Sequence, residues 1–226
     1  MAVKQRARKD EDKAARRRAI LAVAARLLAR QPYQRITMAE VARRCNLAKG
    51  TLYLYFRSKE ELFLAALEDE LALWLDSVTE ALEQLPADTD GDAPQRFATA
   101  VTQNLVQRGT LTVLLPLLHT VLEQNIDEDT AVSFKRMLLE KMGQGALGVE
   151  QAIPGLPPGS GAKVLLRLHA LVVGLRQMAD PAPVVAEVLT RPEMAPLRVD
   201  FEAELIDTLA ATIRGMLRVH PVPDPG

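Results

Sequence analysis

The chain has 226 residues, of which 48% are hydrophobic and 25% are charged, a composition typical of a globular protein that can bury its own core. A single cysteine, Cys45, excludes an intrachain disulfide and a cysteine-rich zinc site. The longest uncharged run, Gly109 to Leu122, contains Pro116 and is too short to span a bilayer. No apolar block follows the basic N-terminus, so we expect no signal peptide and a cytoplasmic protein.

Charge is distributed unevenly along the chain. Residues 1–60 contain 16 Lys and Arg against 5 Asp and Glu, a net charge of +11, whereas residues 61–226 contain 12 and 24, a net charge of −12. A basic segment with helical periodicity is typical of a nucleic-acid-binding module joined to a domain with another role. The alternative is a basic tail that adjusts solubility, which would suit a disordered, low-complexity segment better.

The N-terminal third predicts a helix followed by a capped second helix. Apolar residues recur at three- and four-residue steps within 12–30, and this helix should end before Pro32. Thr37 and Glu40 then form a capping box, in which the Thr37 hydroxyl caps a short helix that runs to about Cys45.

Two more helices are predicted directly after this one. Asn46 suits the left-handed residue that closes a helix, and a short helix is expected over 48–56. Ser58 and Glu61 belong to a second capping box, which should start a long helix that ends near residue 84.

The remainder of the chain is also predicted to be helical. Loops are expected at 86–94 and at 153–161, where Pro, Gly or Asp accumulate. The helices between and after them are predicted at 94–108, 110–125, 128–148, 162–179, 182–190 and 198–219. No sustained strand-like alternation occurs, so we expect an all-α fold. It comprises an N-terminal three-helix helix-turn-helix domain, 1–57, followed by a helical ligand-binding and dimerisation domain, 58–226.

Residues 37–56 have the pattern of a helix-turn-helix, in which the second helix lies in the major groove of DNA. The outward face of that helix carries Lys49, Gly50, Tyr53 and Leu54. Lys49 can reach guanine O6 and N7, Gly50 permits a close backbone approach, and Leu54 can contact a thymine methyl group.

Phosphate contacts are expected around this reading face. The hydroxyls of Thr51, Tyr53 and Tyr55 can donate to phosphates, and Lys59 can hold a phosphate together with the amides that begin the next helix. The alternative is a pair of core helices with buried Tyr and Leu side chains. Tyr53 and Tyr55 are two residues apart and cannot share one helical face, so at least one of them must point outward.

The segments Ile20–Leu28, Ile36–Phe56 and Arg57–Leu67 resemble the DNA-binding domain of TetR-family transcriptional regulators. The resemblance implies an all-helical homodimer that binds double-stranded operator DNA and has an effector pocket in its C-terminal domain. The positions that face DNA in that family match Thr37, Lys49, Gly50, Thr51, Tyr53, Tyr55 and Lys59. Ala48 departs from the family, which usually has Ser or a similar residue there, so a helix cap of about 1 kcal/mol is missing.

An effector pocket is expected around the apolar segment 110–125. A buried helix that Pro116 kinks can frame a cavity, and in the family such helices line the pocket. The candidate ligand-binding residues are Trp74, His119, Phe134, Met137 and His169, each with a plain core role as the alternative. Few charges lie nearby, so an apolar or amphipathic effector is expected. The acidic domain should tolerate a cationic lipophile better than an anion, although Arg167 could reverse this locally.

Helices 162–179 and 198–219 carry apolar residues at three- and four-residue steps. These candidate dimerisation residues are Leu165, Leu168, Val172, Leu175, Leu205, Leu209, Ile213 and Leu217. The resemblance implies that both helices pair with their symmetry mates as a four-helix bundle.

Enzymatic readings have little support in the sequence. His119 and Glu123 stand four residues apart without the second Glu-x-x-His pair of a di-iron bundle, and no glycine-rich nucleotide loop follows a strand. We therefore expect no catalytic residue, metal or cofactor. We also expect Cys45 to be a small core residue rather than a redox sensor.

The sequence predicts a ligand-responsive repressor whose effector releases the operator. The alternative is a DNA-binding regulator without an effector, whose C-terminal domain serves dimerisation or protein docking.

Overall fold

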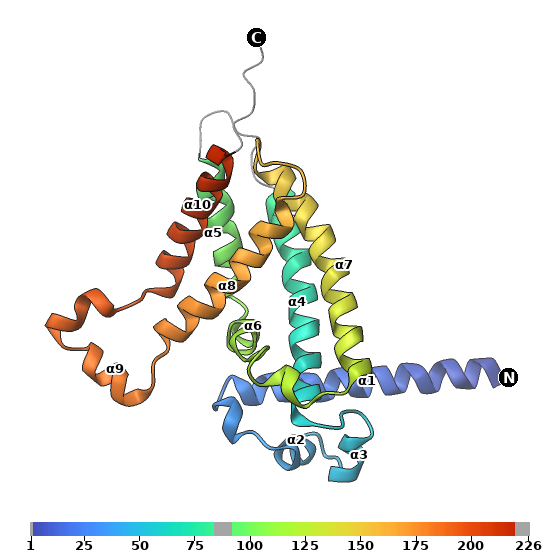
Figure 1. The fold of residues 1–226 in the computed structure, drawn as a ribbon. Coiled ribbons are helices and arrows are strands. Elements are labelled where there is room, and N and C mark those ends of the chain that lie inside the picture. The colour runs from blue at the N-terminus through green and yellow to red at the C-terminus, as the bar shows by residue number, and fades with distance from the viewer. Residues whose placement is uncertain (1, 84–91, 220–226) are drawn as a thin grey trace. The chain divides into compact units, whose positions relative to one another are not determined.

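The computed structural model describes residues 2–83 and 92–219, which form α-helices and short 3-10 helices with no strand (Figure 1). The predicted all-α fold class is therefore confirmed. None of the helices in these ranges is long and apolar enough to cross a membrane. The chain divides into two compact units. One holds the described residues up to Glu70 together with Leu117–Ser133, and the other holds those of Leu71–Pro116 and from Phe134 onward.

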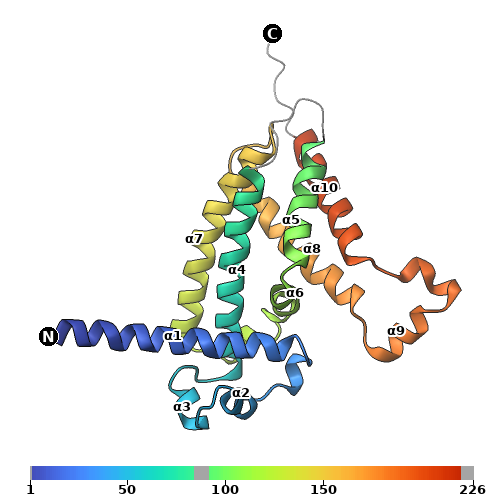
Figure 2. The same ribbon diagram turned by 180° about the vertical axis from the view of Figure 1, so that it is seen from behind.

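The first unit begins with the long helix α1 (Ala2–Leu28), whose core stripe includes Ile20, Ala24 and Leu27. It starts ten residues before the predicted helix, because residues 2–11 contain no Pro or Gly but also no apolar stripe that periodicity could detect. After the 3-10 turn η1 (Tyr33–Arg35) come α2 (Met38–Arg44), α3 (Lys49–Tyr53) and the start of α4 (Lys59–Glu83). Both views place α2 and α3 on the same side of α1 (Figures 1 and 2).

The predicted helix caps are present in this unit. The Thr37 hydroxyl accepts a hydrogen bond from the Glu40 N–H at 3.2 Å, and Asn46 adopts a left-handed φ of 54° after α2. At α4 the Ser58 hydroxyl accepts from the Glu61 N–H at 2.9 Å. These local contacts fix where α2 and α4 begin and hence the lengths of the turns between them.

The second unit contains the later part of α4, α5 (Ala93–Val106) and α6 (Gly109–Leu114). It continues with most of α7 (Glu128–Ala152), α8 (Gly161–Ala179), α9 (Pro183–Leu189), the 3-10 helix η4 (Pro192–Leu197) and α10 (Phe201–Val219). Helix α10 packs against α5 and α8, as both views show (Figures 1 and 2). The predicted loop at 86–94 lies mostly outside the described residues.

The expectation of one continuous helix over 110–125 is wrong. Helix α6 ends at Leu114, and the chain continues as two 3-10 helices, η2 (Leu115–Leu117) and η3 (Leu122–Asn125). Pro116 lies within η2, where its missing N–H and its ring prevent α-helical hydrogen bonding. The proline therefore ends the helix instead of kinking it, although Leu111, Leu115 and Leu122 remain buried as their apolar character requires.

Candidate nucleic-acid interface

Helices α2 and α3 are joined by a tight turn and share a small core. The Leu47 N–H donates to the Ala42 carbonyl at 2.9 Å and closes the turn. Val41 of α2, Leu52 of α3 and Phe56 after it are all buried. Because these side chains hold the two helices together, the opposite face of α3 is presented as a fixed surface.

The outward face of α3 carries the residues that were predicted to face DNA. Lys49 and Gly50 are exposed, Tyr53 is 40% exposed and Leu54 is 79% exposed. The Lys49 ammonium lies 5.8 Å from the centroid of the Tyr53 ring, so the two side chains neighbour each other along one face. Nothing lies within 4 Å of the position that a Cβ of Gly50 would take, so the backbone there is open to a close approach.

Thr51 and Tyr55 are partly exposed, and Thr37 is exposed at the start of α2. The Thr37 hydroxyl already accepts the capping hydrogen bond, which leaves its own O–H free to donate to a phosphate oxygen. The roles of these three hydroxyl groups toward DNA remain predictions.

Lys59 has a structural function that the sequence did not reveal. Its ammonium donates to the carbonyls of Tyr33 at 3.0 Å and Ile36 at 3.1 Å, and it lies 3.9 Å from the centroid of the Tyr33 ring. Burial lowers the pKa of Lys59 below its ordinary value. An ammonium has three N–H donors, and the phosphate contact of Lys59 through the third stays a prediction.

Tyr33 also belongs to the group of side chains around Lys59, and its role was not predicted from the sequence. Its hydroxyl donates to Glu60 at 3.2 Å, and its ring meets the Phe63 ring edge-on with centroids 5.2 Å apart. Burial, together with the negative charge of Glu60, raises the pKa of Tyr33 well above its usual range. An aromatic residue directly after Pro32 was the signal that could have identified it, because such a residue seldom stays in solvent beside a packed helix pair.

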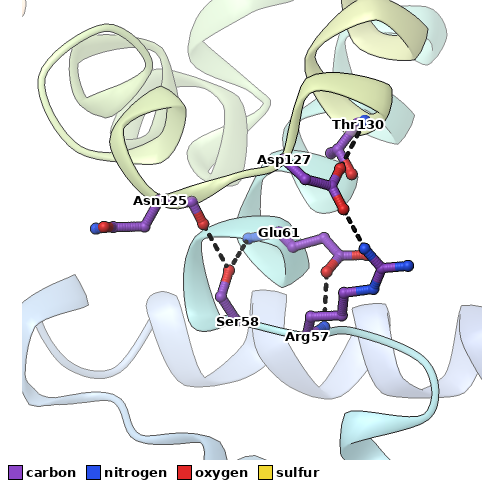
Figure 3. Close-up of polar contacts among 6 residues, drawn as sticks. All are labelled: Arg57, Ser58, Glu61, Asn125, Asp127 and Thr130. Atoms are coloured by element: carbon purple, nitrogen blue, oxygen red, sulfur yellow. Dashed lines mark hydrogen bonds and ion pairs between the residues drawn. The ribbon is translucent and has the colours of Figure 1, made fainter.

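The end of the helix-turn-helix is tied to the segment that precedes α7, within the first unit (Figure 3). The Ser58 hydroxyl donates to the Asn125 carbonyl at 3.1 Å, and the Arg57 guanidinium forms an ion pair with Asp127. Asp127 also accepts from the Thr130 N–H at 2.9 Å. Hydrogen bonds from Thr130, helped by the charge of Arg57, hold the pKa of Asp127 below its ordinary value.

The candidate ligand-binding residues do not all fall in one unit. Trp74, Phe134, Met137 and His169 belong to the second unit, whereas His119 belongs to the first. Trp74 is 6% exposed, Phe134 is buried, and Met137 and His169 are partly exposed.

The side chain of His119 is 55% exposed, and its Nδ1 lies 2.9 Å from a Glu123 oxygen. A shared pocket for all five residues therefore remains a prediction, and the contact with Glu123 is the role that the structure gives His119.

Most of the candidate dimerisation residues are covered within a single protomer. Leu165, Leu168, Val172, Leu205, Leu209 and Ile213 are buried, while Leu175 and Leu217 are partly exposed. The packing of α10 against α5 and α8 contributes to this burial, and Leu165 also lies close to Gly145 of α7. On α8 the exposed face instead carries Leu166, Ala170 and Gly174, and on α10 it carries Ala203, Ala211 and Gly215.

Comparison with protein-family models identifies both parts of the chain. Residues 20–66 match the model described as bacterial regulatory proteins, tetR family, and residues 68–220 match the tetracyclin repressor-like C-terminal domain. The chain is also 24% identical over 135 residues to YerO of Bacillus subtilis, described as an uncharacterized HTH-type transcriptional regulator. That match covers 56% of this chain and 46% of YerO, so it spans less than half of that relative.

Solved structures share the fold at low sequence identity. A TetR transcriptional regulator from Rhodococcus sp. RHA1 is 21% identical, with 94% of this chain and 99% of that chain covered and a TM-score of 0.54. The regulator AibR, solved with isovaleryl coenzyme A and operator DNA, is 20% identical, with coverage of 87% and 97% and a TM-score of 0.51. The matched families and relatives are transcriptional regulators and not enzymes, which agrees with the prediction from the sequence.

Proposed function

Since the chain belongs to the TetR family of bacterial DNA-binding transcriptional regulators, we propose that it is a ligand-responsive repressor that binds its operator as a homodimer. A small apolar or amphipathic effector binds the C-terminal domain and releases the operator. Effector and operator must then favour different conformations, and each weakens the binding of the other to the same extent. The proposed site of action is the cytoplasm, where the operator lies.

The observation that carries the DNA-binding part is the exposed face of α3. A leucine that is 79% exposed next to Tyr53 and Lys49 is costly on a surface that stays in water and useful on a surface that enters a groove. On this proposal Lys49 reads a base, and Tyr53 and Tyr55 contact phosphates. The net charge of +11 over residues 1–60 supplies the attraction to the duplex.

The homodimer is proposed to form through α8 and α10, as the family resemblance implies. The exposed small residues Ala170, Gly174, Ala211 and Gly215 support this choice, because small side chains let two helices approach closely. The larger apolar residues of α8 and α10 then pack in the core of each protomer. A two-fold dimer suits a pseudo-palindromic operator with half-sites about 34–36 Å apart or a multiple of that distance.

Ligand binding is supported by two polar atoms in the second unit. Trp74 Nε1 and the Thr102 hydroxyl are buried and have no hydrogen-bond partner among the described residues. Each such group costs about 1–3 kcal/mol when it stays unpaired, so a ligand with a hydrogen-bond acceptor would find a favourable contact there. AibR, which has a similar fold, was solved with isovaleryl coenzyme A and operator DNA, and this supports the choice of acyl thioesters as one kind of probe.

The test titrates the operator complex with two kinds of compound, lipophilic amines or acyl thioesters on one side and sugar phosphates or divalent metal ions on the other. Release by the lipophilic compounds supports the proposal. Trp74→Phe keeps an aromatic side chain but removes the indole N–H, so it should weaken that release, whereas Leu73→Ala, at an exposed neighbour, should not. Release by the polar compounds with the lipophilic ones inert would refute the proposed effector class. Inertness of every compound would favour a C-terminal domain that serves only dimerisation or protein docking.

A further inference from the structure

The surface of the first unit has a hollow that is separate from the face of α3. Its volume is about 200 Å³, and it is lined by Val23, Arg26 and Leu27 of α1, by Arg30 in the turn after α1, and by Arg44 of α2. Val23 and Leu27 are buried and form its apolar floor, and the three arginines are exposed around them. None of the residues that we predicted to contact DNA lines this hollow.

The three guanidinium groups carry more charge than their neighbours neutralise. Arg44 Nε lies 3.4 Å from a Glu40 oxygen, and the Glu40 carboxylate also accepts from the Gln31 amide at 2.9 Å. Among the described residues, neither Arg26 nor Arg30 has an ion pair or hydrogen bond from its guanidinium. One carboxylate therefore faces three positive charges.

This arrangement has an energetic cost in the protein alone. Arg26 lies near the end of α1 and Arg30 in the turn that follows it, and both line the same hollow, where like charges repel each other. Arg44 adds a third positive charge from another helix. The positive charge of Arg26 also acts on Cys45, because it lowers the pKa of that thiol. Burial raises the same pKa and has the larger effect. Charges that serve only solubility do not need to lie close together. Arg18, for example, is exposed on α1 outside the hollow.

We propose that the hollow binds a phosphate group between Arg26, Arg30 and Arg44. Guanidinium groups match phosphate oxygens in pairs of parallel hydrogen bonds, and the apolar floor keeps the arginine stems in place. The phosphate can belong to a free phosphorylated small molecule or to the backbone of a DNA duplex, because the contacts are the same. The hollow is a second anion site beside the proposed reading face.

The first experiment uses inorganic phosphate and the full chain. Phosphate should raise the melting temperature of the wild type more than chloride does at equal ionic strength, and Arg26→Gln/Arg30→Gln should abolish that difference. The control Arg18→Gln/Arg35→Gln removes the same charge from exposed positions of the same unit outside the hollow. This control should still melt at a higher temperature in phosphate than in chloride. Without phosphate, the hollow variant should melt no lower than the wild type, because it loses the repulsion between two like charges that line one hollow.

The second experiment measures affinity for a mixed-sequence duplex as a function of salt. If the phosphate comes from DNA, the slope of log K against log salt should be smaller for Arg26→Gln/Arg30→Gln than for the control, by about 0.9 for each lost phosphate contact. A phosphate effect that the hollow variant loses supports the site. A smaller salt slope in the hollow variant then assigns the phosphate to DNA, and an unchanged slope assigns it to a free phosphorylated molecule. If the hollow variant and the control behave alike in both, the proposal is wrong. Lys49→Ala should leave the response to inorganic phosphate intact, so failure of this site and failure of the reading face can be told apart.

Discussion

Lys59 combines a structural contact with a predicted DNA contact in one side chain. Its ammonium supplies hydrogen bonds to two carbonyl groups that precede α2, those of Tyr33 and Ile36. Lys59→Met keeps the aliphatic length but removes both donors, so the free energy of unfolding should fall by about 1–3 kcal/mol. Lys49→Met, at an exposed position, should change it by less than about 0.5 kcal/mol. Urea unfolding measures both values, and equal stability of the two variants would contradict the structural role of Lys59.

Cys45 is the residue whose reactivity the structure predicts most directly. Burial raises the pKa of its thiol, and the charges of Arg26 and Arg16 offset only part of that rise. The thiolate is the reactive form, so alkylation by iodoacetamide near neutral pH should be slower in the folded protein than in urea and should accelerate as the pH rises. Arg26→Gln removes one charge that lowers this pKa and should slow the reaction further. Folded-state alkylation as fast as in urea would show that the thiol is exposed and ionised, as a redox sensor requires.

At the scale of helices, α3 is the element with a missing cap. Ala48 has the extended backbone of a cap residue, but no side-chain hydrogen bond satisfies the first amides of α3. Ala48→Ser supplies a hydroxyl at that position and should raise the free energy of unfolding by about 1 kcal/mol. Ala22→Ser, at an exposed position inside α1, should give no such gain. Thermal or urea unfolding compares the two, and a loss of stability in Ala48→Ser would mean that the position cannot hold a cap.

Elements whose signals are local were predictable from the sequence. The caps at Thr37 and Ser58 bind amides three residues away, so the residue order alone located the starts of α2 and α4. The segment 110–125 differs because its apolar residues indicate burial and not a backbone conformation, and Pro116 then prevents a continuous helix.

Some features of the candidate site were likewise predictable from local sequence signals, and others were not. Exposure of Lys49, Tyr53 and Leu54 follows from helical spacing and from the burial of Leu52. The ion pair of Arg57 with Asp127 joins residues that are 70 positions apart, and no local pattern marks it. The apolar stripes of α8 and α10 were visible, but periodicity shows which side chains share a face and not which element covers that face.

At the scale of the whole molecule, dimer formation is proposed to use the exposed faces of α8 and α10. Ala170→Glu/Ala211→Glu places charges on those faces without disturbing the protomer core, so sedimentation should show monomers and the operator affinity should fall. Ala22→Glu in the first unit should remain dimeric. Val172→Glu would not test the interface, because Val172 is buried and a charge there should unfold the protomer. Dimers that survive the double substitution would refute this interface.

The central claim is that α3 reads the operator, and one binding measurement tests it most directly. An operator is selected from a pool of random duplexes with the wild-type protein, and affinities of wild type, Lys49→Ala and Tyr53→Ala are measured for that operator and for each of its single-base variants. Lys49→Ala should remove the preference at one base pair, worth about 1–3 kcal/mol, whereas Tyr53→Ala should weaken binding to all sequences about equally. If both variants bind every duplex as the wild type does, α3 is not the reading helix.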